Sequence, residues 1–401
     1  MVAVSARFRA GAALLGPAFV AAIAYVDPGN VATNTAAGAT YGYLLVWVLV
    51  VANVMAGLVQ YLSAKLGLVT GQSLPEAVRD HLPRPVRLAY WGQAEVVAMA
   101  TDLAEVLGGA IALHLLFDLP LLLGGVITGV VSTLLLLVQD KRGQKPFERV
   151  ITTMLAVIAV GFMAGLFVAP PDVPSAFGGL LPRFDGADSV LLAAGMLGAT
   201  VMPHAVYLHS ALARDRHGRN PSVLKATKVD VVVAMVLAGA VNMAMLLLAA
   251  SALQGKENVD TLEGAHAAVG ATLGGGIALL FALGLLASGF ASTAVGCYAG
   301  AVVMDGLLHV RIPLLARRLI TLVPALAILA LGVDPTFALV LSQVVLSFGI
   351  PFALVPLVWL TARRSVMGSY ANRRSVTAAA WLVAAAVVVL NVVLIYLTVS
   401  A

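Results

Sequence analysis

The chain has 401 residues, of which 61% are hydrophobic and only 11% are charged. Since a soluble domain carries about 25% charged residues, this composition excludes a soluble globular protein and a disordered chain, and it is too apolar for an outer-membrane barrel. The single cysteine, Cys297, excludes a disulfide framework, a cysteine-rich zinc site and an iron–sulfur cluster. What remains is an all-α, multi-pass membrane protein with short loops.

Apolar runs bounded by charged residues, proline or glycine predict eleven membrane spans along the chain. The loops between them are too short for a second domain, so we expect one transmembrane domain over residues 1–401. In chain order, the predicted spans cover residues 11–36, 42–69, 87–115, 119–139, 148–169, 188–212, 229–253, 273–304, 314–332, 336–361 and 376–398.

Lys and Arg residues fall almost entirely on one side of these spans. With the N-terminus in the cytoplasm, only Arg183 and Lys256 lie outside, and the other 22 of the 24 Lys and Arg residues lie on the cytoplasmic side. This distribution follows the positive-inside rule and explains the net charge of +5 without nucleic acid. We therefore expect a protein of the plasma or bacterial inner membrane, with its C-terminus outside and no obligate protein partner.

The first predicted span contains the sequence Asp27-Pro28-Gly29-Asn30. Proline removes a backbone donor and disfavours a helical residue before it, and glycine permits a turn, so this pair predicts a broken helix. Broken backbone at membrane depth is tolerated only inside the protein or beside a water-filled cavity. A carboxylate there is costly and usually functional. Asp27 and Asn30 therefore offer oxygen ligands at a candidate site.

The third predicted span carries three carboxylates at intervals of seven and three residues. This spacing places all three within one arc of a helix. Such a row is typical of a proton relay, although ion pairs that only hold helices together remain an alternative. We expect basic partners from the start of the ninth span and from the loop after the sixth. The row consists of Glu95, Asp102 and Glu105, and the candidate partners are Arg317, Arg318 and Arg216.

Pro203 interrupts the sixth predicted span as Pro28 interrupts the first. Two broken helices separated by five spans predict two halves of inverted topology, because five is an odd number. We expect these halves at residues 11–169 and 188–361, with residues 376–398 as an additional eleventh span. The substrate site would then lie near the middle of the membrane, between the two breaks.

The groups at the two breaks favour a divalent transition metal. Asp27 would repel an anionic substrate, and Na⁺ or Ca²⁺ would prefer a cage made only of oxygen atoms. The Met202 thioether is a soft ligand that suits mid and late transition metals. His204 is expected to line the cavity or relay protons, because a strong imidazole ligand would hold the metal too long. His209 is expected only to pack.

At these residues the sequence resembles the Nramp family of proton-coupled divalent metal transporters, and in particular its bacterial members. The quartet at residues 27–30 resembles the first-helix motif of the family, and Met202-Pro203-His204 resembles its sixth-helix motif. The similarity extends through residues 16–18, 101–105 and 341–343. It implies a LeuT-like fold and import of Mn²⁺ and Fe²⁺ with H⁺ by alternating access. Co²⁺, Zn²⁺ and Cd²⁺ are further candidate substrates, and no prosthetic group is implied.

The resemblance also implies roles for individual residues. Asp27, Asn30, the Met202 sulfur and the Ala199 carbonyl would hold the metal, and the carboxylate–arginine network of the third span would carry protons towards the cytoplasm. Asp27 would also accept a proton. The Ala24 carbonyl and the Gln343 side chain would join the metal ligands in some conformations.

Other functions remain open. An amine transporter or a Mg²⁺ transporter of the same architecture would fit the spans, although Met202 argues against Mg²⁺. A channel is a further alternative. We do not expect an enzyme, because the chain lacks a His-Glu-x-x-His motif, Asp27 has no matching Asp in the interior of the sixth or seventh span, and Ser288 has no supporting signal.

Overall fold

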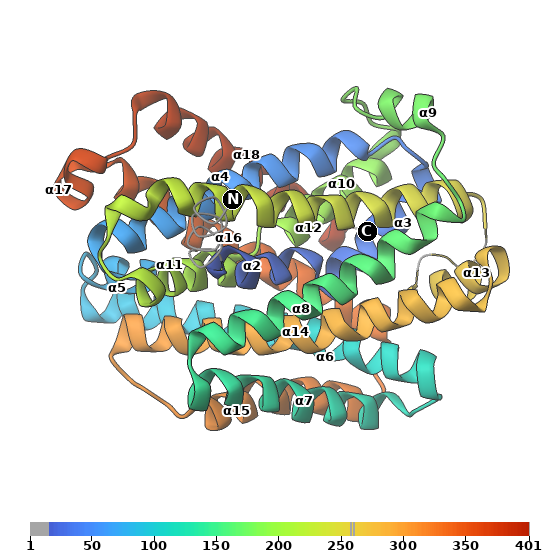
Figure 1. Ribbon diagram of the computed structural model, residues 1–401, viewed down its shortest axis with the longest axis horizontal. Coiled ribbons are helices and arrows are strands. Elements are labelled where there is room, and N and C mark those ends of the chain that lie inside the picture. The colour runs from blue at the N-terminus through green and yellow to red at the C-terminus, as the bar shows by residue number, and fades with distance from the viewer. Residues whose placement is uncertain (1–15, 257–258, 260, 401) are drawn as a thin grey trace, which may run out of the picture.

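The computed structural model describes residues 16–256, 259 and 261–400. Over these residues the chain forms helices and no strands, and the long helices run side by side as one bundle (Figure 1). Nine helical stretches among the described residues are long and apolar enough to cross a membrane. The prediction of an all-α, multi-pass membrane protein is confirmed.

The first and the ninth predicted spans are the two that fall outside these nine. The first begins in residues outside the described part, and from there it consists of α2 (Pro17–Ala22), the 3₁₀ helix η1 (Ile23–Val26) and α3 (Pro28–Tyr41). The ninth, α15 (Leu314–Ala330), has 17 residues. At 1.5 Å per residue it is about 25 Å long, slightly shorter than the hydrocarbon core.

The remaining predicted spans each coincide with one long helix, except the sixth, which is split in two. Short helices occupy the loops: α5 (Leu74–Arg79), α9 (Val173–Gly178), α13 (Leu262–Leu273) and α17 (Arg364–Met367). The long helices are α4 (Val46–Thr70), α6 (Arg84–Phe117), α7 (Leu121–Arg142), α8 (Gln144–Met163), α10 (Gly186–Thr200), α11 (Pro203–His217), α12 (Leu224–Ala252), α14 (Gly275–Leu308), α16 (Pro335–Ala362) and α18 (Arg374–Ser400).

Glycines allow the central helices to approach one another closely. A Cβ atom at Gly289 of α14 would lie 2.7 Å from the backbone nitrogen of Gly109 in α6, and a Cβ at Gly38 of α3 would lie 2.8 Å from the Cβ of Ala249 in α12. Small residues are the usual means of close helix packing in membranes, where lipid provides no hydrophobic drive between helices. The helices around the first break are thus held together backbone against backbone.

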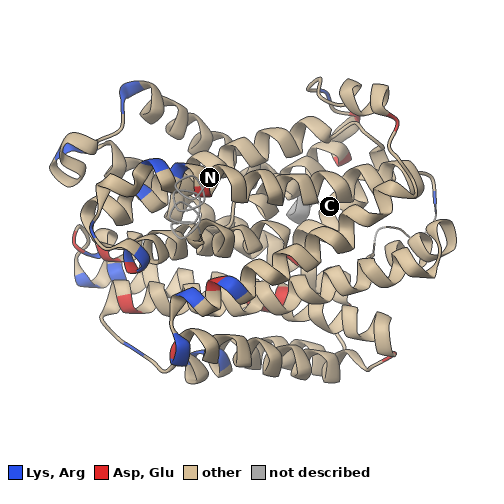
Figure 2. Cartoon of the chain, in the orientation of Figure 1, with Lys and Arg blue, Asp and Glu red and all other residues tan. Residues whose placement is uncertain are grey.

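Lys and Arg residues gather at one end of the bundle (Figure 2). This end, which we call the basic end, carries α5 and α17, whereas α9 and α13 lie at the opposite end (Figure 1). The segregation agrees with the positive-inside pattern read from the sequence.

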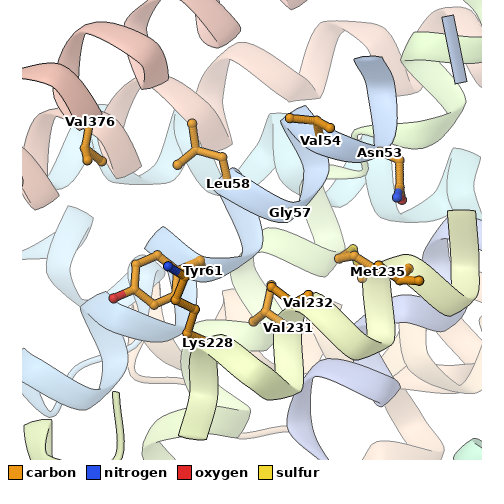
Figure 3. Close-up of a pocket in the computed structure, with 11 residues that line it drawn as sticks. Asn53, Val54, Gly57, Leu58, Tyr61, Lys228, Val231, Val232, Met235 and Val376 are labelled. Atoms are coloured by element: carbon orange, nitrogen blue, oxygen red, sulfur yellow. The ribbon is translucent and has the colours of Figure 1, made fainter. Parts of the chain in front are cut away.

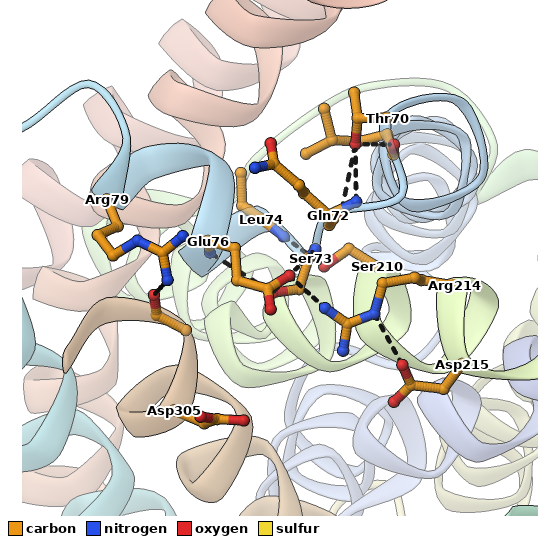
Figure 4. Close-up of polar contacts among 12 residues, drawn as sticks. Thr70, Gln72, Ser73, Leu74, Glu76, Arg79, Ser210, Arg214, Asp215 and Asp305 are labelled. Carbon is orange, nitrogen blue, oxygen red and sulfur yellow. Dashed lines mark hydrogen bonds and ion pairs between the residues drawn. The ribbon is translucent and has the colours of Figure 1, made fainter. Parts of the chain in front are cut away.

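The short helix α5 is fastened to α11 at the basic end (Figure 4). Its N-terminus has a capping box, in which Ser73 and Glu76 satisfy each other's backbone N–H groups. The backbone N–H of Leu74 donates to Oγ of Ser210 at 2.8 Å, and the Glu76 carboxylate forms an ion pair with Arg214. The loop after α4 is therefore held against the second half of the sixth span.

Candidate functional site

The first break is shaped by Asp27. Its backbone is extended, with φ −68° and ψ 168°, between η1 and α3. Its Oδ1 accepts hydrogen bonds from the backbone nitrogen of Asn30 at 2.9 Å and from Nδ2 of Asn30 at 2.6 Å. Asp27 is thus the N-cap of α3 and satisfies a backbone donor that the start of a helix leaves free. Only 2% of Asp27 is exposed, so this carboxylate lies inside the protein.

Two side chains from the second half of the chain satisfy carbonyls released by this break. Nδ2 of Asn242 in α12 donates to the Tyr25 carbonyl at 2.7 Å, and Oγ of Ser288 in α14 donates to the Val26 carbonyl at 2.6 Å. Neither residue was among the predicted site residues. The available signal was the one side-chain amide of the seventh span and a hydroxyl among several in the eighth, since buried backbone at membrane depth requires such partners.

The second break lies between α10 and α11. Val201 and Met202 leave the helical conformation, with ψ values of 82° and 121°, and α11 begins at Pro203. No side chain caps this helix start. Met202 is 1% exposed and lies in the same apolar cluster as the residues of η1. The break therefore places a thioether and a helix end in the protein interior.

Asn30 joins the two breaks. Its Nδ2 donates to the Ala199 carbonyl at 2.8 Å as well as to Asp27, and its Oδ1 accepts from Oγ1 of Thr200 at 3.4 Å. Three of the predicted metal ligands, Asp27, Asn30 and Ala199, are thereby in direct contact. Thr200 is an additional neighbour that the sequence alone did not single out.

Gln343 of α16 reaches the same place from another helix. A Cβ atom at Gly29 would lie 2.4 Å from Nε2 of Gln343, so the Gln343 amide packs directly against the backbone of the first break. Both amide atoms of Gln343 are buried and have no hydrogen-bond partner among the described residues. Such orphaned groups need an explanation, because an unpaired buried amide is costly. Ala24, the other conditional ligand, is fully buried in η1, three residues before Asp27.

A cavity leads to the first break from the end opposite the basic end. It has a volume of about 160 Å³ and is lined by Gly29, Thr33 and Gln343 together with Glu263 of α13. A much smaller cavity of about 20 Å³ lies beside His204 and Ala98. Since one water molecule needs about 10–15 Å³ by this measure, the smaller cavity has room for a single water.

His204 and His209 differ in their surroundings, although both are buried on α11. Neither ring nitrogen of His204 has a hydrogen-bond partner among the described residues. Nδ1 of His209 lies 2.8 Å from Oε1 of Gln60, whose Nε2 donates to the Tyr25 hydroxyl at 2.6 Å. His209 therefore belongs to a packed polar chain, whereas His204 faces a cavity.

The carboxylates of α6 meet two buried arginines of α15. Nη1 of Arg317 lies 2.6 and 2.5 Å from the two carboxylate oxygens of Glu95, and Nη1 of Arg318 lies 2.5 Å from Oδ1 of Asp102. Both arginines are only 1% exposed. Buried ion pairs of this kind compensate charges that would otherwise be very costly at this depth.

Glu105 is the unpaired member of the row. It is fully buried, and neither carboxylate oxygen has a hydrogen-bond partner among the described residues. One turn further along α6, Gly108 packs so closely on Pro28 that a Cβ atom there would collide with the proline ring. Glu105 therefore lies between the ion pairs of α6 and the break at Asp27.

Arg216 has an ion-pair partner that the sequence alone did not assign to it. Its Nη2 lies 3.7 Å from Oε2 of Glu148 in α8. Nearby, Asp230 of α12 accepts the backbone N–H groups of Gly16 and Ala18, each at 3.0 Å. Glu148 and Asp230 lie near the basic end, but both side chains are buried inside the protein. Arg216 thus lies with the groups that fasten the start of α2, and its predicted part in the proton route of α6 stays a prediction.

No group of three or more His, Cys, Asp or Glu residues in the described part of the chain could hold a metal ion. The two breaks offer a different set of ligands: one carboxylate, one amide, a backbone carbonyl and a thioether. A site with one charged ligand binds weakly compared with the Cys and His sites of structural metals.

A bundle of membrane helices whose first and sixth spans break beside each other defines the class of LeuT-like membrane transporters. The nucleobase–cation symporter Mhp1 shares this fold with a TM-score of 0.62 at 15% identity, over 96% of this chain and 91% of that one. Residues 18–397 match the family model described as "Natural resistance-associated macrophage protein-like". The chain belongs to the Nramp family.

Relatives of this chain cover nearly its whole length. The divalent metal cation transporter MntH of Mycobacterium tuberculosis is 65% identical over 393 residues, which is 96% of this chain and 92% of that protein. The MntH of Deinococcus radiodurans is 49% identical over 384 residues, covering 94% and 88%. The crystal structure of a manganese transporter from Eremococcus coleocola matches with a TM-score of 0.89 at 31% identity, covering 97% and 87%. These proteins are named transporters, and the family is not one of enzymes.

Proposed function

We propose that this protein is a secondary active transporter that imports divalent transition metal ions, above all Mn²⁺ and Fe²⁺, together with protons. The observation that carries the proposal is Asn30, which bridges the carboxylate of one helix break and a free carbonyl of the other. The names of the relatives support the metal, since they are divalent metal cation and manganese transporters. Co²⁺, Zn²⁺ and Cd²⁺ are further candidate substrates.

In the proposed site, a metal ion binds between Asp27 and Ala199, at the position that the N–H groups of the Asn30 side chain occupy in this structure. Without metal, the amide N–H groups bridge Oδ1 of Asp27 and the carbonyl oxygen of Ala199. A cation at this point is attracted to the same two oxygens, and Asn30 can turn its own oxygen towards it. Met202 adds the soft ligand that discriminates against Mg²⁺ and Ca²⁺. The Ala24 carbonyl and Gln343 join as the helices move.

The proposed proton route begins at Asp27, since a bound divalent cation favours the ionised form of this carboxylate. His204, which has no hydrogen-bond partner among the described residues, and Glu105 are the next acceptors. The pairs of Asp102 with Arg318 and of Glu95 with Arg317 continue the route along α6 towards the basic end. A part for Arg216 at the basic end of the route stays a prediction, and there it forms an ion pair with Glu148 of α8.

The proposed direction of transport follows from the charge distribution and the cavities. The basic end would face the cytoplasm of a plasma or bacterial inner membrane, with the N-terminus inside and the C-terminus outside. The larger cavity reaches the first break from the other end, as an entry path for external metal would. Alternating access would then rock the predicted inverted repeats, residues 11–169 and 188–361, against each other, with residues 376–398 outside both.

Proteoliposomes test this proposal. Wild-type protein should take up Mn²⁺ and acidify the lumen, and Fe²⁺ should compete with Mn²⁺. The Asp27→Ala variant should do neither, and unchanged uptake by this variant would show that the site is wrong. Uptake of an organic amine without uptake of Mn²⁺ would indicate an amine transporter, and uptake of Mg²⁺ without Mn²⁺ would indicate a Mg²⁺ transporter. Uptake that does not depend on the gradient of a second ion would indicate a channel.

Proton coupling needs its own variant. Glu105→Gln should lower proton uptake about tenfold or more, because a relay group contributes 10²–10⁴-fold where it acts directly. Mn²⁺ affinity should change less than about threefold, since Glu105 lies beside the site rather than in it. The comparison uses metal binding by calorimetry and lumen pH by a trapped dye. Equal losses in both measurements would remove Glu105 from the proton route.

A further inference from the structure

A groove in the wall of the bundle lies between α4, α12 and the start of α18, away from both helix breaks (Figure 3). Its volume is about 420 Å³, and apolar side chains form most of its surface. Several of them are strongly exposed, with Val54 at 68%, Val236 at 60% and Val232 at 50%. In a membrane-spanning region this exposure is to lipid, so the groove opens towards the bilayer.

The groove has a length and a direction. Along α12 it extends from Lys228 to Val236, and along the antiparallel α4 from Tyr61 to Asn53. Eight residues of helix correspond to about 12 Å at 1.5 Å per residue. Gly57 lies at the middle, where a Cβ atom would meet nothing closer than Cγ of Met235 at 4.0 Å. The missing side chain of Gly57 therefore creates the hollow.

One end of the groove is cationic and the rest is apolar. Lys228 lies in the first turn or two of α12, at the basic end, and it has no ion-pair or hydrogen-bond partner among the residues that the structure describes. Tyr61 lies beside it (Figure 3), and tyrosine is common at the level of lipid headgroups. Val376 closes this end from α18, and Arg373 and Arg374, both exposed, precede it in the chain.

We propose that this groove binds one anionic phospholipid. Its phosphate lies at Lys228, and one acyl chain lies over Gly57 between α4 and α12. The charge complements a negative headgroup, and the narrow apolar length complements a hydrocarbon chain. A helix of a second copy would instead need a broad apolar face without a cation at one end.

Native mass spectrometry of the full-length protein in detergent tests this proposal. Phosphatidylglycerol and phosphatidylcholine with identical acyl chains are titrated separately, and the bound fraction is compared. Wild-type protein should prefer phosphatidylglycerol about fivefold, the effect of roughly one lysine near a charged membrane surface. Lys228→Gln should remove this preference and leave the affinity for phosphatidylcholine unchanged. Lys225→Gln, an exposed lysine one turn earlier and outside the groove, is the matched control.

A second variant tests the position of the acyl chain. Gly57→Leu places a side chain in the hollow, and its Cβ would lie no closer than 4.0 Å to a neighbour, so the variant should fold and lower the binding of both lipids. Equal binding of the two lipids to wild-type protein, equal effects of the two lysine variants, or unchanged binding to Gly57→Leu would each overturn the proposal. A dimer mass that is lost in Gly57→Leu would assign the groove to a second copy instead.

Discussion

The two helix breaks differ in how their open backbone is satisfied. At the first break, Asp27 caps α3, while Asn242 and Ser288 bind the carbonyls of Tyr25 and Val26. At the second break, Met202 precedes α11 without a side-chain cap, and the Ala199 carbonyl receives its hydrogen bond from Asn30 of the first break. The first break is supported by its surroundings, whereas the second depends on the first.

This difference suggests a division of labour. In the proposed metal site, the first break supplies the charge and a fixed backbone, because its carbonyls are already held by hydrogen bonds from α12 and α14. The second break supplies a carbonyl and a thioether that a metal ion can capture with less rearrangement. We expect loss of the carboxylate to be felt most strongly, followed by loss of the thioether and then by loss of the supporting hydrogen bonds.

The largest effect is expected from Asp27→Asn. Asparagine caps a helix as well as aspartate does, so α3 should still form. The variant removes the only charged ligand, and Mn²⁺ affinity measured by calorimetry should fall more than about 100-fold, beyond the effect of groups outside the ligand shell. An affinity within threefold of wild type would show that the first break does not supply the charge of the site.

A smaller, selective effect is expected from Met202→Ala. Cd²⁺, the softer ion, should lose roughly tenfold in affinity and Mn²⁺ less, while Ca²⁺ competition should increase. Met196→Ala is the matched control, since Met196 is equally buried but lies within α10. If both variants alter the metal preference equally, the second break contributes packing rather than a ligand.

The hydrogen bonds that support the first break can be tested without replacing a proposed metal ligand. Ser288→Ala leaves the Val26 carbonyl unsatisfied and should lower stability by about 1–3 kcal/mol. Thr293→Val is the control, because the Thr293 hydroxyl has one hydrogen-bond partner among the described residues, the Gly289 carbonyl of its own helix. The measurement is the unfolding midpoint in detergent. Equal shifts in the two variants would mean that the break does not depend on Ser288.

The smallest effect concerns α5, which is fastened to α11 beyond the second break. Burial raises the pKa of the Glu76 carboxyl, but the backbone N–H of Ser73 and the Arg214 guanidinium outweigh it and hold the pKa below its usual range. A depressed pKa stabilises the folded state above the ordinary Glu pKa of about 4.3, and this contribution is lost as pH falls through the folded value.

The unfolding midpoint of Glu76→Gln should therefore lie below that of wild type at pH 7. The gap should narrow as the pH falls below about 4.3. The measurement is a pair of melting curves recorded across this pH range. A gap that is constant with pH would show that the ion pair with Arg214 does not hold α5 in place.

Much of the fold was available from the sequence, because membrane helices are determined by composition and their breaks by proline. The residues at both breaks were also predictable, since Asp27 and Met202 are polar or soft groups next to Pro28 and Pro203. Boundaries were less certain: the ninth span is a helix of only 17 residues, and the first begins outside the described residues.

The partners of the site were not predictable in the same way. Asn242 and Ser288 act from helices more than 200 residues away from the carbonyls that they bind, and no local pattern specifies such a contact. The pairing of Arg216 with Glu148 was not predictable for the same reason, because its charge indicated that a carboxylate partner exists but not which one. Contacts between residues far apart in the sequence depend on how the helices pack, and the positions of the spans in the sequence do not specify that packing.

The buried arginines of α15 have a consequence for the net charge around the first break and α6. Four carboxylates lie within these spans, at positions 27, 95, 102 and 105, and two guanidinium groups face them, so full ionisation leaves two negative charges uncompensated. One divalent cation supplies the two missing charges, and so do two protons. A monovalent ion leaves one charge unbalanced in a medium where that costs several kcal/mol. This interior is thus electroneutral when it holds one divalent cation, or when two protons neutralise two of the four carboxylates.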